Sequence, residues 1–261
     1  MFYAGLIVDY LKTYMKTRLT YRADFALEVL TDLAYQFVSL AMIFVMFMHT
    51  EEIGGWSREE IVFIYGYFMI PYGIFQCFFN FYGFTERYIV KGEMDRVLTR
   101  PAYNLVQLSL ENLDPSSLFG ALTGAVIMGA AWSRLGLGFH VADVPALAVM
   151  VVGSVMIYAG IYVALTAVSF FTDAPTGILP LLYNIQNYGR YPANIYNAPV
   201  RILLTWVLPF AFVGFYPAGY FLDKEAMRGM ALLTPAVGAV FFTMGVLVWN
   251  FGVRRYRGAG S

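Results

Sequence analysis

Six stretches of about twenty mostly apolar residues limit what this chain can fold into. They lie at 25–48, 61–84, 113–132, 144–171, 202–222 and 231–250. A helix of about 20 apolar residues is long enough to cross the roughly 30 Å hydrocarbon core of a bilayer. Because 59% of the residues are apolar and only 13% are charged, lipid suits the chain better than water. We therefore predict an all-α integral membrane protein with six transmembrane helices, forming a single domain over 1–261.

The first 23 residues are predicted to form a helix that lies in the membrane interface. One helical face would carry the mostly apolar side chains, and another the charged ones: Ile7, Leu11, Tyr14 and Met15 against Asp9, Lys12 and Lys16. A signal peptide is not expected, because the apolar core is short, Asp9 interrupts it and no small-residue cleavage site follows.

The Lys and Arg residues fall unequally on the two sides of the predicted membrane. Thirteen of the 17 lie on one side: Lys12, Lys16, Arg18, Arg22, Arg87, Lys91, Arg96, Arg100, Arg190, Arg201, Arg254, Arg255 and Arg257. The other side holds Arg58, Arg134, Lys224 and Arg228. Since cytoplasmic loops are the richer in Lys and Arg, both termini are predicted to be cytoplasmic in a multi-pass protein of the cell (inner) membrane.

Composition also excludes several kinds of partner and site. The formal net charge of zero gives no reason to expect nucleic acid. Cys77 is the only cysteine, and the two histidines, His49 and His140, lie far apart in the sequence. We therefore expect neither a disulfide framework nor a metal site.

Residues 90–101, VKGEMDRVLTRP, gather many charges between two apolar stretches. Gly92 can end or break a helix, and Pro101 cannot continue one. Between them, acidic residues come first and basic residues last, the order that a helix dipole favours: Glu93 and Asp95, then Arg96 and Arg100. Met94, Val97 and Leu98 would share an apolar face. A short amphipathic helix and an ordinary charged loop both fit this pattern.

The same segment resembles the cytoplasmic segment after the second helix in permeases of the ABC-2 superfamily, which are six-helix membrane subunits of ABC transporters. The resemblance rests on Gly92, Met94, Asp95, Leu98 and Pro101, with Met94 standing where leucine is more usual. A second patch, 190–218, is similar to the same branch of small permeases in Tyr191-Pro192, Arg201, Pro209 and Tyr216-Pro217.

The resemblance implies that 86–101 is a cytoplasmic coupling helix that contacts a separate ABC ATPase subunit. The implied coupling residues are Gly92, Glu93, Met94, Asp95, Arg96, Val97, Leu98, Arg100 and Pro101. No G-x-x-x-x-G-K-[ST] motif occurs in the chain, so it does not cradle ATP through that loop. We expect a transport subunit rather than an enzyme, without a cofactor of its own, while the partner binds ATP and Mg²⁺.

The resemblance further implies an exporter in which two permease chains, identical or paralogous, enclose the pathway within the bilayer. Polar side chains in the first, second and fifth spans are the candidates for lining it: Asp32, Gln36, Gln76, Asn80, Asn184 and Asn187. Asp32 lies deep enough to require a partner or a water-filled cavity. An ion pair with cytoplasmic arginines and a site for a cationic substrate are both open.

The fifth crossing has two interpretations. Hydropathy places one helix over 202–222, despite its two prolines. The resemblance instead implies that 175–191 crosses outward and that 192–222 is a re-entrant hairpin, which would reduce the charge bias to eleven against six. The gate or re-entrant candidates are Pro192, Arg201, Pro209 and Pro217. The alternative function is a stand-alone secondary transporter or channel.

Overall fold

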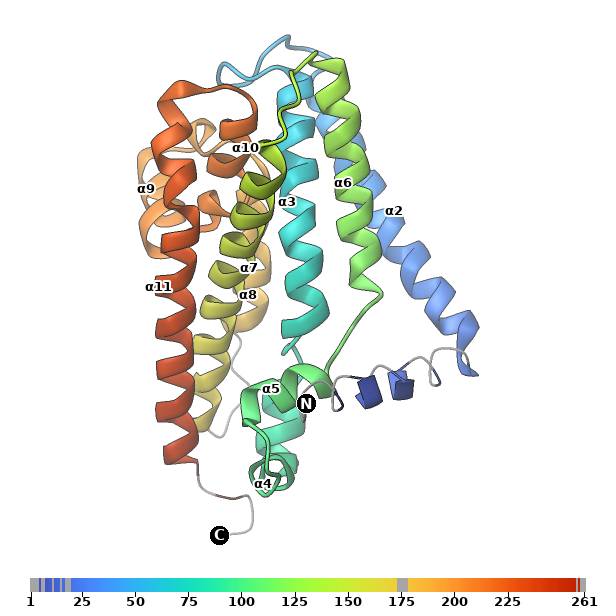
Figure 1. The fold of residues 1–261 in the computed structure, drawn as a ribbon, viewed down its shortest axis with the longest axis vertical. Coiled ribbons are helices and arrows are strands. Elements are labelled where there is room, and N and C mark those ends of the chain that lie inside the picture. Colours follow the sequence, from blue (N-terminus) through green and yellow to red (C-terminus); the bar gives the residue numbers. More distant parts are fainter. Residues whose placement is uncertain are drawn as a thin grey trace.

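The computed structural model describes residues 5, 8–10, 12–14, 16, 20–172, 178–256 and 258, and its regular elements there are all helical. Five helices are long and apolar enough to cross a membrane (Figure 1): α2 (Arg22–Met46), α3 (Arg58–Phe79), α6 (Ser117–Arg134), α7 (Asp143–Ala167) and α11 (Glu225–Arg255). These helices confirm five of the predicted stretches, with ends shifted by a few residues.

Short helices gather at one end of the bundle, between α3 and α6. They are a π-helix at Thr85–Val90, α4 (Glu93–Leu98) and α5 (Asn104–Glu111). α2 begins and α11 ends at this same end (Figure 1). Residues 8–10 and 12–14 are helical, and Tyr10 hydrogen-bonds to Glu111 of α5. Three residues of the predicted amphipathic face, Ile7, Leu11 and Met15, lie outside the described residues.

α3 is the central helix, and α2 is the least enclosed. In α3, 67% of an apolar 18-residue stretch is buried within the molecule, whereas in α2 the corresponding share is 6%. α6 packs closely on α3, because a Cβ added at Gly124 would lie 2.5 Å from the Cβ of Met69. Gly129, five residues further along α6, would meet nothing within 4 Å. Of these two glycines, Gly124 therefore lies at the close contact with α3, and Gly129 does not.

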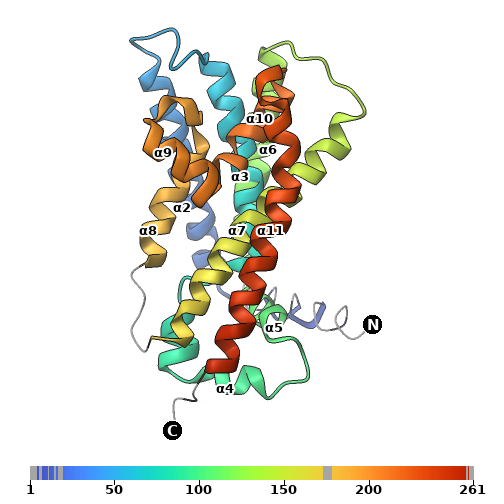
Figure 2. The same cartoon turned by 90° about the vertical axis from the view of Figure 1, so that its left-hand side faces the viewer.

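α7 and α11 run side by side, with their backbones almost in contact (Figure 2). A Cβ added at Gly160 would lie 2.3 Å from the carbonyl carbon of Phe241, and one added at Gly245 would lie 2.4 Å from the Gly160 oxygen. Gly238 faces Gly153 in the same way, with its added Cβ 2.4 Å from the Gly153 oxygen. Glycine is required at these crossings because no side chain fits between the helices.

The segment before α11 contains no straight helix over 202–222. α8 (Ile178–Ile185) continues as a 3₁₀-helix to Arg190, and a further 3₁₀-turn spans Ala193–Ile195. α9 (Ala198–Ile202) then runs through a π-helix to Val207, and a 3₁₀-turn at Phe210–Phe212 leads into α10 (Phe215–Phe221).

The chain bends by 72° between 198–207 and 210–221. Leu208 precedes Pro209 and has an extended backbone, with φ −124° and ψ 84°. A residue before proline is driven from the helical region, and proline lacks the N–H that would continue the helix. The segment is therefore not one continuous helix over 202–222, and a broken span and a re-entrant loop both fit the bend.

Both ends of this bent segment are held at the same end of the bundle. Asn194 Nδ2 donates to the Gly54 carbonyl at 2.9 Å, and Trp56 Nε1 donates to Asn194 Oδ1 at 2.9 Å. Lys224 forms an ion pair with Glu60, at the start of α3. The chain from 194 to 224 thus leaves and returns to the end of the bundle opposite α4 and α5 (Figure 1).

Candidate functional site

α4 forms within the predicted segment, but its apolar face is largely covered by this chain. Gly92 has φ +74°, a left-handed conformation that glycine adopts without strain, and it separates the π-helix from α4. Met94 and Val97 are fully buried. They belong to a cluster with Phe84, Phe170, Trp249 and other residues from the lower ends of α3, α7 and α11.

Met94 and Val97, two of the implied coupling residues, are therefore covered by this chain, and their part in coupling stays a prediction. Leu98 is 39% exposed. It shares the surface with charged residues and the terminating proline: Glu93 (partly), Asp95, Arg96, Arg100 and Pro101. What α4 presents outward is one leucine surrounded by charges.

Glu111, at the end of α5, joins the short helices into one unit. Its side chain is 6% exposed. Arg96 donates to both carboxylate oxygens at 3.1 and 2.8 Å, and Arg100 donates to Oε1 at 3.0 Å. Tyr10, Tyr88 and Gln107 also donate to this carboxylate, at 3.2, 3.2 and 2.9 Å. The network links the N-terminal segment, the π-helix, α4 and α5.

The pKa of Glu111 reflects this network. Burial raises the pKa, but the hydrogen bonds from Gln107 and Arg96 and the charge of Arg96 outweigh burial and hold it below the ordinary value. The carboxylate is therefore ionised at neutral pH and acts as a fixed negative centre between two arginines.

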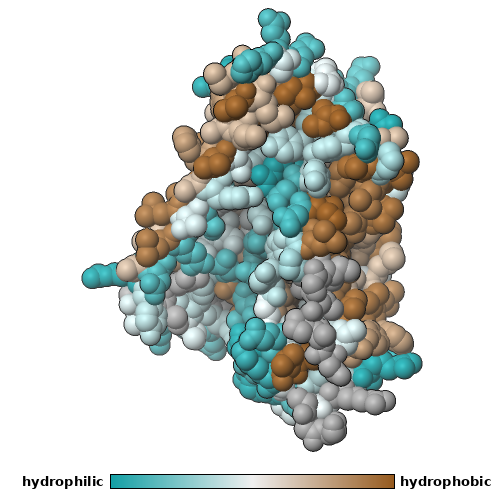
Figure 3. All heavy atoms as spheres, turned by 180° about the vertical axis from the view of Figure 1, so that it is seen from behind, coloured by the Kyte–Doolittle hydropathy of each residue, from teal (hydrophilic) through white to brown (hydrophobic). Residues whose placement is uncertain are grey.

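A polar cavity lies inside the bundle between α2, α3 and the start of α6. Its volume is about 130 Å³, and its lining includes Asp32, Gln36, Gln76 and Arg190. The aromatic rings of Tyr65, Phe68 and Tyr72 form part of its wall. From behind, the molecular surface is hollowed beside α2, and hydrophilic residues gather there between hydrophobic flanks (Figure 3). Three of the predicted pathway residues thus meet in one cavity.

Buried polar atoms of this cavity lack partners within the described part of the chain. They are Gln36 Oε1, Gln76 Oε1 and Arg190 Nε. One of the two alternatives for Asp32, an ion pair with cytoplasmic arginines, is also not found among the described residues. Asp32 is exposed beside the cavity instead. Unpaired polar groups at this depth indicate that water or a ligand occupies the space.

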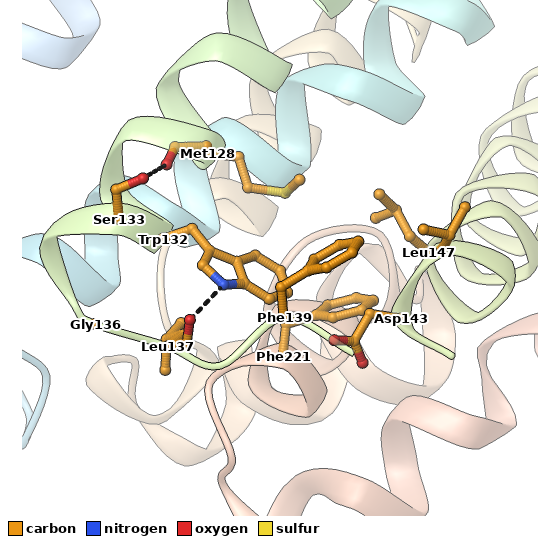
Figure 4. A pocket seen from close by; sticks show the side chains of 11 residues that line it. Met128, Trp132, Ser133, Gly136, Leu137, Phe139, Asp143, Leu147 and Phe221 are labelled. Atoms are coloured by element: carbon orange, nitrogen blue, oxygen red, sulfur yellow. Dashed lines mark hydrogen bonds between the residues drawn. The ribbon is translucent and has the colours of Figure 1, made fainter. Parts of the chain in front are cut away.

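A larger cavity of about 500 Å³ lies between α6 and α7 at the other end of the bundle from α4 (Figure 4). Trp132, Phe139, Phe221 and Leu147 line it, and the indole of Trp132 donates to the Leu137 carbonyl at 3.0 Å. Its lining contains none of the buried side-chain atoms that lack a hydrogen bond in the described residues. It is larger than the polar cavity, but its chemistry is that of apolar packing.

A family model described as "ABC-2 family transporter protein" matches residues 33–260. This chain belongs to the ABC-2 transporter family. The match covers nearly all of the sequence and includes α3, the α4–α5 unit and the bent segment before α11. No curated protein and no solved structure matches the chain. Within the family, the chain is a membrane transport component with several spanning helices rather than a catalytic subunit.

The remaining pathway candidates of this ABC-2 chain do not line the cavity. α3 ends at Phe79, and Asn80 is its C-cap residue. Asn80 therefore does not continue the helix and does not share a helical face with Gln76. Asn184 is exposed and donates to the Pro180 carbonyl. Asn187 accepts a hydrogen bond from Arg190, so it supports the cavity from outside.

The gate or re-entrant candidates mark the bent segment rather than the cavity. Pro192 precedes the 3₁₀-turn at Ala193–Ile195, Pro209 follows the break, and Pro217 lies buried in the first turn of α10. Arg201 is exposed in the last turn of α9. Their positions are structural, and their role as a gate stays a prediction.

Sequence reasoning missed Glu111, the centre of the network that joins α4 and α5, and Arg190 as a residue of the polar cavity. Glu111 lies 15 residues after Arg96 and on a different helix, so no local sequence pattern indicates that the two side chains meet. Arg190 was counted only as a loop charge. Its neighbour Asn187, three residues earlier on the same side of a helix, was the one available signal.

Proposed function

We propose that this chain is the membrane-spanning permease subunit of an ATP-driven exporter. It would pair with a second permease chain, identical or paralogous, and with cytoplasmic ATPase subunits that bind ATP and Mg²⁺. Membership of the ABC-2 family and the missing phosphate-loop motif support this assignment. The excess of Lys and Arg at the α4 end supports a cytoplasmic location for that end and for both termini, in the cell (inner) membrane.

The arrangement of α4 carries the proposal. Its inner face, Met94 and Val97, belongs to a buried cluster that also holds residues of α7 and α11 and of the chain that follows α3. Arg96 of α4 and Arg100, which follows α4, both donate to Glu111 of α5. Tyr10 donates to the same carboxylate. A push on α4 by an ATPase would therefore reach three spanning helices and the N-terminal segment together. Coupling of this kind shifts a packed unit between two arrangements rather than bending it.

Substitution of Leu98 tests the coupling. Leu98→Asp should weaken ATPase binding and abolish substrate-stimulated hydrolysis, because burying a leucine against a partner contributes about 1.5–3 kcal/mol. Val106→Asp is the matched control, since Val106 is 37% exposed on neighbouring α5 and should retain both properties. Co-purification of the ATPase and its hydrolysis rate are the measurements.

Two outcomes of this experiment contradict the proposal. Normal binding and stimulation by Leu98→Asp would show that α4 is not the docking element. Robust ion-driven transport by the purified chain alone, in vesicles, would assign it to the alternative class, a stand-alone secondary transporter or channel.

We further propose that 192–222 is a re-entrant hairpin that enters and leaves the membrane at the outer face. The hydrogen bonds of Asn194 and the ion pair of Lys224 support it, because they hold both ends of the segment near 53–60. The helical stretch from α8 to Arg190 would then complete the fifth crossing, and α11 would be the sixth.

Cysteine labelling tests this topology on a background in which buried Cys77 is replaced by alanine. Cysteines at Arg58 and Arg201, both exposed, should react with an impermeant thiol reagent in intact cells. Cysteines at Arg96 and Arg255 should be protected until the membrane is opened. Protection at Arg201 together with labelling at Arg58 would contradict the hairpin.

A further inference from the structure

Arg190 is a buried cation without a counter-ion in the described part of the chain. It is 9% exposed. Its NH1 donates to Ser39 Oγ at 3.2 Å and its NH2 donates to Asn187 Oδ1, both neutral acceptors. No described carboxylate lies within 4.0 Å of its guanidinium nitrogens. Its Nε–H has no acceptor among the residues that the structure describes, and the side chain lines the polar cavity.

An arrangement of this kind is costly unless something else supplies the negative charge. An arginine keeps its charge in proteins, and a charge removed from water without a partner costs several kcal/mol. The rings of Tyr65 and Phe68, 5.8 and 5.6 Å from the guanidinium carbon, offset part of this cost through cation–π attraction. They leave the Nε–H unsatisfied.

Asp32 does not fill this role. Its carboxylate lines the same cavity but is exposed, so water can hydrate it, and it forms no ion pair with Arg190. Of the two charges, the buried one is the arginine. The cavity therefore lacks an anion at its inner end, while a carboxylate stands at its exposed side.

We propose that this cavity binds a single anionic group, a phosphate or carboxylate, which accepts a hydrogen bond from Nε of Arg190. About 130 Å³ is room for roughly four water molecules, which suits one such group and its first waters. The unpaired amide oxygens of Gln36 and Gln76 accept from a hydroxyl or from those waters. On the proposed transport function, this group is the polar head of the exported molecule.

Binding to the purified full-length chain tests the site without any ATPase, so its outcome is independent of the coupling proposal. The probes are hexyl phosphate, inorganic phosphate and hexyltrimethylammonium, and the readout is the unfolding temperature as a function of probe concentration. Hexyl phosphate should stabilise the protein saturably. Equal affinity for inorganic phosphate would assign the site to a free anion, whereas a preference for hexyl phosphate would assign it to an amphiphile.

Variants locate the site. Arg190→Gln should weaken hexyl phosphate binding by about tenfold or more, the usual scale for a hydrogen bond to a charged group. Arg201→Gln is the control, because Arg201 is exposed and outside the cavity, and it should bind like the unmodified chain. Gln76→Glu keeps the side-chain size and places a negative charge in the cavity, which repels an anion, so it should also weaken binding. This second variant tests the site if Arg190→Gln does not fold.

Three results would overturn the proposal. One is the absence of saturable hexyl phosphate binding. Another is undiminished binding in whichever of Arg190→Gln and Gln76→Glu folds. The third is preferential stabilisation by hexyltrimethylammonium that disappears in Asp32→Asn, which would give the cavity to a cation.

Discussion

Replacement of Gly160 by alanine is expected to destabilise the protein by about 3 kcal/mol, the upper part of the usual range for overpacking. The added Cβ would lie 2.3 Å from both the carbonyl carbon and oxygen of Phe241. These are backbone atoms, so α7 and α11 have to separate as whole helices. In a bilayer that separation sacrifices the close van der Waals packing that drives helix association.

The control for this substitution lies in the partner helix. A Cβ added at Gly229, in the second turn of α11, would meet nothing within 4 Å. Gly229→Ala should therefore stabilise the protein by about 0.5–1 kcal/mol, because alanine loses less backbone entropy in a helix than glycine. Equilibrium unfolding in mixed micelles measures both variants, and equal effects would refute the direct contact of the two helices.

Replacement of Glu111 by glutamine is expected to release the α4–α5 unit and cost about 1.5–3 kcal/mol of stability. In the amide, one of the two acceptor oxygens becomes an N–H donor. The bonds from Arg96 and Tyr88 to Oε2, or those from Arg96, Arg100, Gln107 and Tyr10 to Oε1, are then lost. Hydrogen exchange across 85–111 should rise. On the proposed coupling, stimulation of a partner ATPase should also fall, even though Leu98 is unchanged. Glu86→Gln removes an exposed pair with Lys91 and should leave exchange unaltered.

The lowered pKa of Glu111 adds a pH dependence. Its folded-state pKa lies below the ordinary 4.5, so its contribution to stability is complete above about pH 4.5 and is lost as the pH falls through the folded value. The stability of the unmodified chain should therefore fall by this contribution as the pH is lowered, whereas the stability of Glu111→Gln should not show this loss. An identical acid response of the two proteins would show that the carboxylate is not held by the network.

Periodic and local features of this protein could be predicted from its sequence. Five spanning helices follow from runs of apolar residues, and α4 follows from Gly92, the order of its charges and Pro101. Asp32 and Gln36 lie four residues apart, which places them on one face of the predicted first span. These signals are local, since they depend on helix geometry alone.

Features that depend on contacts between distant segments were not predictable. Whether Met94 faces a partner or Trp249 of α11 depends on where α11 ends in space. The burial of Arg190 depends on the bend at Leu208–Pro209 and on Ser39 of α2. Asn80 shows the smallest failure of this kind, because a helix that ends one residue early removes a side chain from the face that periodicity assigns to it.

The glycine contacts between α7 and α11 also divide the molecule mechanically. Two helices that meet at Gly153 with Gly238, and again at Gly160 with Gly245, cannot slide past one another without separating, so they act as one stiff strut. In α2, only 6% of the apolar 18-residue stretch is buried within the molecule, so the position of this helix depends mainly on its surroundings. On the proposed transport function, bilayer thickness or a neighbouring permease chain would then set the resistance to opening the polar cavity.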